Sequence, residues 1–117
     1  MNRKILSVGF DFGASFFGSG KGAELIHNAW NLHKMLPQSI FVKLKNKYPN
    51  IYDKSMIQER ESLVSKINKW VFKETIDYPH HMIIGGDHSL ALGSVLSSIN
   101  KINSVKEQKN SNMAVVW

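Results

Sequence analysis

Hydrophobic positions divide the chain into short apolar runs and longer segments with helical spacing. The short runs are rich in β-branched and aromatic residues, which predicts strands. They span residues 5–12, 40–44, 82–84 and 113–117. The longer segments predict helices. They span residues 23–36, 55–76 and 89 to about 103. Strands that alternate with helices are typical of an α/β fold, so we expect a parallel, doubly wound sheet with right-handed crossovers.

Each predicted helix carries an apolar stripe that we expect to face the core. The first stripe consists of Leu25, Ala29, Leu32 and Leu36. The second consists of Leu63, Ile67, Trp70 and Val71. The third consists of Leu90, Leu92, Val95, Leu96 and Ile99. Pro37 ends the first helix, and Ser55 with Gln58 matches a capping box at the start of the second.

Composition limits the chain to one domain and excludes some kinds of site. The chain has 117 residues, of which 43% are hydrophobic and 21% are charged, as in ordinary globular proteins. It has no cysteine, so it forms neither a disulfide nor a thiolate metal site, and a cytoplasmic location fits. Because apolar runs stay well below about 18 residues, we expect no membrane span.

The net charge of +6 raises the question of a nucleic-acid partner. The lysines are spread over residues 43–47, 66–73 and 101–109 rather than gathered in one block. Dispersed lysines are typical of solvated faces, so the pattern favours a charged surface over a basic nucleic-acid-binding module.

The stretch with the strongest candidates for functional side chains begins at Met82. A short apolar run, residues 82–84, suits a strand buried on both faces. Gly85 and Gly86 then allow a sharp backbone turn. The polar residues that follow, Asp87 to Ser89, lie at the connection between the predicted strand and the next predicted helix. Sites in open parallel sheets form at the carboxyl ends of strands, so His88 stands where a functional side chain is expected.

This stretch resembles a known motif. Gly85-Gly86-Asp87-His88-Ser89, followed by Leu-Ala-Leu-Gly-Ser, is similar to the first metal-site motif of the arginases, members of the ureohydrolase family that also includes agmatinase-like enzymes. Residues 9–29 also resemble the opening of some bacterial arginases. The resemblance implies a sheet of the arginase type, two manganese ions, and hydrolysis of L-arginine to ornithine and urea in the cytoplasm.

The resemblance assigns a role to each residue of the motif. His88 is implied as a manganese ligand, and imidazole is a good ligand for such a metal. Asp87 is a metal ligand, a partner that orients the ligands or a helix cap, and Ser89 is a cap. Gly85 and Gly86 are needed for the backbone turn.

The chain also departs from the family pattern. The Asp-Ala-His-x-Asp and Ser-x-Asp-x-Asp motifs that supply the other metal ligands in arginases are absent from this sequence. We therefore expect residues 1–117 to form a single incomplete arginase-like domain, with no catalytic residue of its own and no activity alone. Two alternatives remain open: a non-catalytic fragment that binds a full-length ureohydrolase, and an agmatinase-like or other guanidino hydrolase. The family forms homo-oligomers.

The other candidate residues favour structural roles. His80 and His81 precede the strand, so we expect surface positions at the end opposite His88, and His27 and His33 are predicted to be surface residues or packing partners. The loop at residues 18–22 fails the Walker pattern at both ends. The three tryptophans are predicted to anchor the core. They are Trp30, Trp70 and Trp117.

Overall fold

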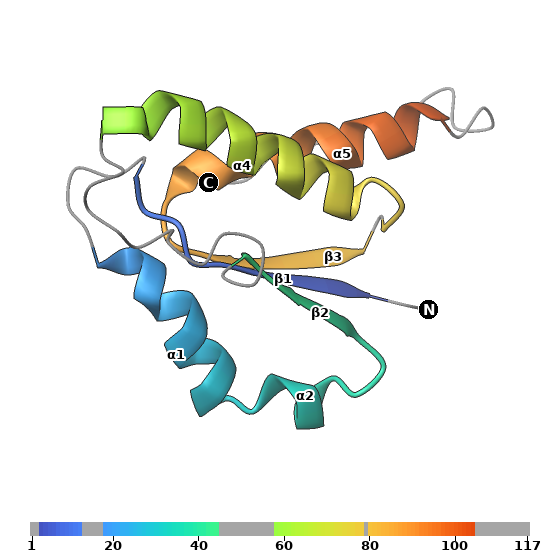
Figure 1. Ribbon diagram of the computed structural model, residues 1–117. Coiled ribbons are helices and arrows are strands. Elements are labelled where there is room, and N and C mark those ends of the chain that lie inside the picture. Colours follow the sequence, from blue (N-terminus) through green and yellow to red (C-terminus); the bar gives the residue numbers. More distant parts are fainter. Residues whose placement is uncertain (1–2, 13–17, 45–57, 79, 105–117) are drawn as a thin grey trace.

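A computed structural model of the chain describes residues 3–12, 18–44, 58–78 and 80–104. Its centre is a three-stranded parallel sheet with the order β2-β1-β3 (Figure 1). The strands are β1 (Lys4–Val8), β2 (Ile40–Lys43) and β3 (His81–Gly85). Lys4 pairs with Ile40 on one side and with His81 on the other. The predicted parallel α/β arrangement is confirmed.

Helices lie on both faces of this sheet (Figure 1). On one face are α4 (Arg60–Thr75) and α5 (Ala91–Ser104), which pack side by side. On the other are α1 (Gly22–Ala29) and α2 (Leu32–Met35). Short 3-10 helices, η1 (Ser19–Lys21) and η3 (His88–Leu90), precede α1 and α5. The strand predicted at residues 113–117, with Trp117, and the cap residue Ser55 lie outside the described residues.

The core lies between β1 and α4. From β1 and the segment after it come Leu6, Val8, Phe10 and Phe12, each at most 1% exposed. The strand predicted over residues 5–12 ends at Val8, where the N–H of Phe10 bonds back to the Val8 carbonyl. The predicted stripe of α4 is confirmed. Its residues Leu63, Ile67, Trp70 and Val71 are all buried.

Of the stripe predicted for the first helix, only Leu32 is buried. The helix predicted over residues 23–36 is interrupted at Asn31, whose φ of 48° is left-handed. The interruption rotates the second half, so Leu32 is buried while Leu25 is 67% exposed. Ala23 and His27 face the sheet instead. Trp30, predicted to anchor the core, is 60% exposed.

Only part of the third predicted stripe is buried. Leu90 is 4% exposed, but Leu92 is 60% exposed and Leu96 is 45% exposed. Gly93 and Ser97, both buried, form the face of α5 that meets α4. The buried face is therefore lined by small residues, because the two helices approach closely, and the larger side chains are turned outward.

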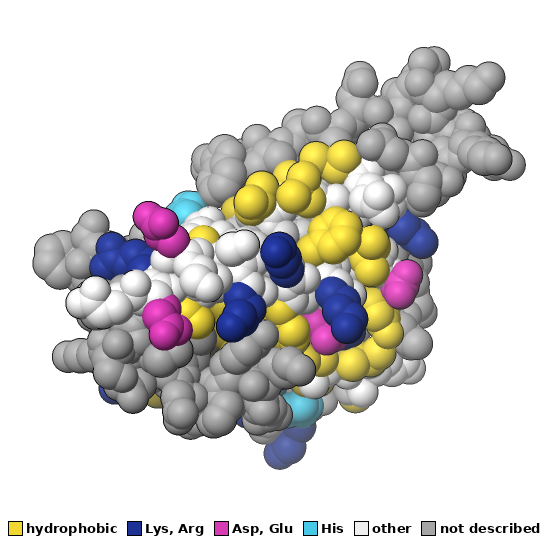
Figure 2. Space-filling model, turned by 45° about the horizontal axis from the view of Figure 1, so that its top comes forward, with side chains coloured by type: hydrophobic (Ala, Val, Ile, Leu, Met, Phe, Trp, Pro, Cys, Tyr) yellow, Lys and Arg dark blue, Asp and Glu magenta, His cyan; other side chains and the backbone are white. Residues whose placement is uncertain are grey.

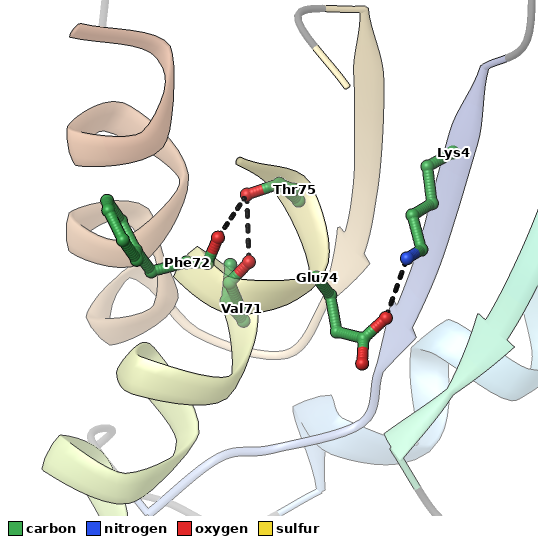
Figure 3. Close-up of polar contacts among 5 residues, drawn as sticks. All are labelled: Lys4, Val71, Phe72, Glu74 and Thr75. Carbon is green, nitrogen blue, oxygen red and sulfur yellow. Dashed lines mark hydrogen bonds and ion pairs between the residues drawn. The ribbon is translucent and has the colours of Figure 1, made fainter. Parts of the chain in front are cut away.

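Polar contacts tie α4 to its neighbours near its carboxyl end. The hydroxyl of Thr75 donates 2.8 Å to the carbonyl of Val71 and lies 2.7 Å from the hydroxyl of Ser97 on α5. The ammonium of Lys4 on β1 lies 2.7 Å from a carboxylate oxygen of Glu74 (Figure 3). Both groups are partly buried, so this ion pair fixes the end of α4 over β1 with less screening than a surface pair.

His27 is buried on the opposite face of the sheet, packed against His33 and Phe41. Its ring centroid is 4.7 Å from that of His33 and 5.4 Å from that of Phe41. Among the described residues, its Nδ1 atom has no hydrogen-bond partner. Burial, and next Lys43 and His33, lower the pKa of His27 below its ordinary value of 6.5.

Stability should therefore fall in mild acid. The unfolded chain binds a proton at His27 more readily than the folded chain, so this contribution is complete above about pH 6.5 and decreases below it. We expect the urea midpoint to drop between about pH 7.5 and about pH 5, and to drop less in His27→Phe. His80→Ala, at an exposed histidine, is the control and should keep the full drop. An equal drop in His27→Phe would contradict the assignment.

Candidate functional site

His88 lies at the carboxyl end of β3, where the sequence predicted it. β3 ends at Gly85, and η3 begins at His88 itself, so Gly86 and Asp87 make the whole connection. His88 is exposed, and with Asp87 it lines a surface pocket of about 300 Å³. A side chain of α5, Ser94, lines the same pocket.

Asp87 caps the helix that follows it. Its backbone is extended, and its Oδ1 atom accepts a 2.8 Å hydrogen bond from the N–H of Ser89. Of the roles predicted for Asp87, the structure therefore shows the helix cap. The cap predicted at Ser89 is wrong, because Asp87 occupies that position and the Ser89 hydroxyl is buried without a hydrogen-bond partner among the described residues.

Gly86 packs closely on the backbone of Phe10, just after β1. A Cβ atom at this position would overlap the carbonyl oxygen of Phe10 and lie 3.1 Å from the Cα atom of Gly20. The N–H of Asp87 also donates to the Phe10 carbonyl, at 3.3 Å. The turn predicted at Gly85 and Gly86 is therefore a point where three segments of backbone meet, which explains why a residue without a side chain stands there.

Asp11 fixes the loop on the other side of this meeting point. Its buried Oδ2 atom accepts hydrogen bonds from the N–H groups of Gly18, at 2.7 Å, and Gly20, at 3.1 Å. Because Gly20 in turn lies against Gly86, Asp11 positions the loop beside the His88 segment. Sequence analysis gave Asp11 no role, and the available signal was a carboxylate between two phenylalanines inside the predicted strand.

Asn68 of α4 holds the start of α5. Its Nδ2 atom donates to the Ser89 carbonyl at 2.7 Å, and its Oδ1 atom accepts from the N–H of Gly93 at 2.9 Å. Ser89 and Gly93 are four residues apart, the separation at which helical backbone groups pair. The buried amide thus bridges both groups and locks the orientation of the segment that carries His88. Sequence analysis missed Asn68, although a polar residue between the stripe residues Ile67 and Trp70 indicates a buried hydrogen-bonding role.

His81 is more constrained than the predicted surface position. Its Nδ1 atom lies 2.8 Å from the carbonyl oxygen of Tyr78, and its Nε2 atom lies 2.8 Å from the hydroxyl of Ser94. A carbonyl only accepts, so Nδ1 carries a proton and the neutral ring accepts from Ser94 through Nε2. His81 therefore joins β3 to α5. As predicted, it lies at the strand end opposite Gly85 and His88.

The described residues do not by themselves fit a manganese centre. Within the parts of the chain that the structure describes, no three side chains of His, Asp or Glu come together as a metal would require. One oxygen of Asp87 is already used in capping. The arrangement offers one exposed imidazole on a rigid turn, which could contribute one ligand to a larger site.

Comparisons with family models, with curated proteins and with solved structures find no match for this chain. In the described part of the chain, the helices are too short or too polar to cross a membrane.

Proposed function

We propose that the chain carries part of an arginase-like metallohydrolase site, with His88 as a ligand position for manganese and arginine as the substrate of the complete site. The observation that carries the proposal is the position of His88. It is exposed, directly follows Gly85-Gly86-Asp87 and stands at the carboxyl end of a parallel strand. Agmatine-like guanidino compounds remain the alternative substrate class.

The rigidity of the turn supports this proposal. The turn is fixed by the contact of Gly86 with Phe10, by the Asp87 cap and by the bridge from Asn68. A ligand position needs such support, because a metal-binding imidazole must be held in a fixed direction. One imidazole does not hold two ions, so we expect the described residues by themselves not to support hydrolysis.

Two measurements test the proposal. Titration of the ¹⁵N-labelled chain with Mn²⁺ should broaden the amide resonances around His88 first, because a paramagnetic ion acts only on nearby nuclei. His88→Ala should abolish this selective broadening, whereas His80→Ala, at the opposite end of the strand, should leave it unchanged. Incubation with arginine and Mn²⁺ should release no urea above a mock purification.

Each measurement has an outcome that contradicts the proposal. Broadening that is centred elsewhere, or that persists in His88→Ala, would remove the metal-ligand role of His88. Urea release that copurifies with the chain and survives removal of contaminating arginase would show that the site is complete, contrary to the proposal.

A further inference from the structure

The outer face of α5 exposes large apolar side chains in a row. Leu92, Leu96 and Ile99 are 60%, 45% and 38% exposed, and their spacing of four and three residues places them on one side of the helix. Hydrophobic side chains line this face of the molecule in Figure 2. Contiguous apolar surface of this kind marks interaction sites in soluble proteins.

This row borders a groove between α4 and α5 with a volume of about 560 Å³. Val64 and Phe72 of α4 form one wall, and Leu92 and Leu96 of α5 form the other. Gly93 lines the groove where α5 packs closely on α4, and the Asn68 amide beside it is already bonded to α5. The groove therefore offers apolar walls and few free polar groups.

A row of lysines runs along α4 beside the groove. Lys69 lines the groove, and Lys66 and Lys73 lie three residues before and four residues after it, so the three exposed lysines share one side of the helix. Figure 2 shows lysine or arginine side chains beside the hydrophobic ones on this face. Glu61 is the acidic residue that lines the groove.

The charge argues against a second copy of this chain as the occupant. A symmetric dimer through this face would bring two sets of Lys66, Lys69 and Lys73 together, in chains that each carry a net charge of +6. A nucleic-acid strand would leave the apolar walls unused. An apolar groove with a row of lysines beside it is complementary to a helix that has one apolar face and acidic flanks.

We propose that the groove between α4 and α5 binds an amphipathic helix of a partner protein, with apolar side chains between Phe72 and Leu96 and acidic side chains over Lys69 and Lys73. The interaction is independent of His88, which lies outside the groove.

A synthetic helical peptide tests the proposal. The probe has the length of α5, 14 residues, with leucines at i, i+3, i+4, i+7 and i+11, glutamates on the flanks and a fluorescent label read by anisotropy. It should bind the chain and bind more weakly as salt rises. A twin with lysine flanks and a peptide with the same composition but scrambled order should bind at least about ten-fold more weakly.

Variants of exposed groove residues locate the site. Leu96→Glu should weaken binding of the acidic peptide at least about ten-fold, because one leucine contact is lost and a like charge is added. Lys69→Glu should weaken binding of the acidic peptide about five-fold at low salt. It should also reduce the difference in affinity between the acidic peptide and the lysine-flanked peptide. Leu25→Glu, at an exposed leucine on the opposite face of the sheet, is the matched control and should bind normally. Circular dichroism checks that each variant is folded.

Three results of the peptide measurements would overturn the proposal. They are absence of binding, equal binding of the acidic and lysine-flanked peptides, and unchanged binding by folded Leu96→Glu. Sedimentation of the chain as a dimer that Leu96→Glu dissociates would also overturn it, because the groove would then be an interface between two copies.

Discussion

Gly86→Ala is expected to destabilise the folded chain by about 3 kcal/mol or to prevent folding, the upper end of the range for an overpacked site. The added methyl group would overlap the Phe10 carbonyl oxygen and lie 2.9 Å from the Phe10 carbonyl carbon. Both atoms belong to the backbone of the segment just after the central strand, so they cannot move aside as a flexible side chain would. The β3 turn must shift away from β1, and His88 would move with it.

The measurement is urea unfolding followed by far-UV circular dichroism. Gly22→Ala is the matched control, because a Cβ atom at Gly22 meets nothing within 4 Å and its φ of −60° is helical. That variant should be neutral or more stable by up to about 1 kcal/mol. If Gly86→Ala were as stable as Gly22→Ala, the close contact of the turn with Phe10 would be wrong.

Asn68→Leu should cost about 2–4 kcal/mol of stability, although leucine has a similar size and a stronger helix propensity. The substitution removes the partner of the Ser89 carbonyl and of the Gly93 N–H at the buried junction of α4 and α5. Each unsatisfied buried group is destabilising by about 1–3 kcal/mol, less where water can enter.

Asn100→Leu, at an exposed asparagine of α5, is the control for Asn68→Leu and should change the free energy of unfolding by less than about 0.5 kcal/mol. Amide hydrogen exchange gives the sharper test. In Asn68→Leu the Gly93 amide should exchange faster than in the parent chain, beyond the increase seen at amides elsewhere in α5. Equal stability of the two leucine variants would contradict the bridging role of Asn68.

Sequence patterns predicted the parallel sheet and the place of His88 because both depend on local signals. The run at residues 82–84 and the glycines after it specify a strand and a turn without reference to distant residues. The prediction that this strand is buried on both faces is wrong, because Met82 is 50% exposed on an edge strand of the described sheet. The sequence could not decide which residue caps the helix, because Asp87 and Ser89 are both good capping residues. The structure shows that the cap is Asp87.

The buried faces of α1 and α5 were harder to predict, for a physical reason. Periodicity identifies an apolar stripe, but the face that packs depends on the partner helix. At the contact of α4 with α5, close approach favours Gly93 and Ser97, so Leu92 and Leu96 are displaced outward. In the first helix, the left-handed Asn31 changes the phase between Leu25 and Leu32. Asn68 was missed because its partners are backbone groups of another element.

The strand order also has a consequence for how the chain folds during synthesis. β1 is synthesised first but occupies the middle of the sheet. It pairs with β3 on one side, where Lys4 lies opposite His81, a residue that is synthesised much later. Such distant pairings slow folding, because a long loop must close before any contact compensates for the lost entropy. One edge of the newly made β1 therefore stays unpaired until β3 has been synthesised, and an unpaired apolar strand edge in a growing chain is prone to aggregation.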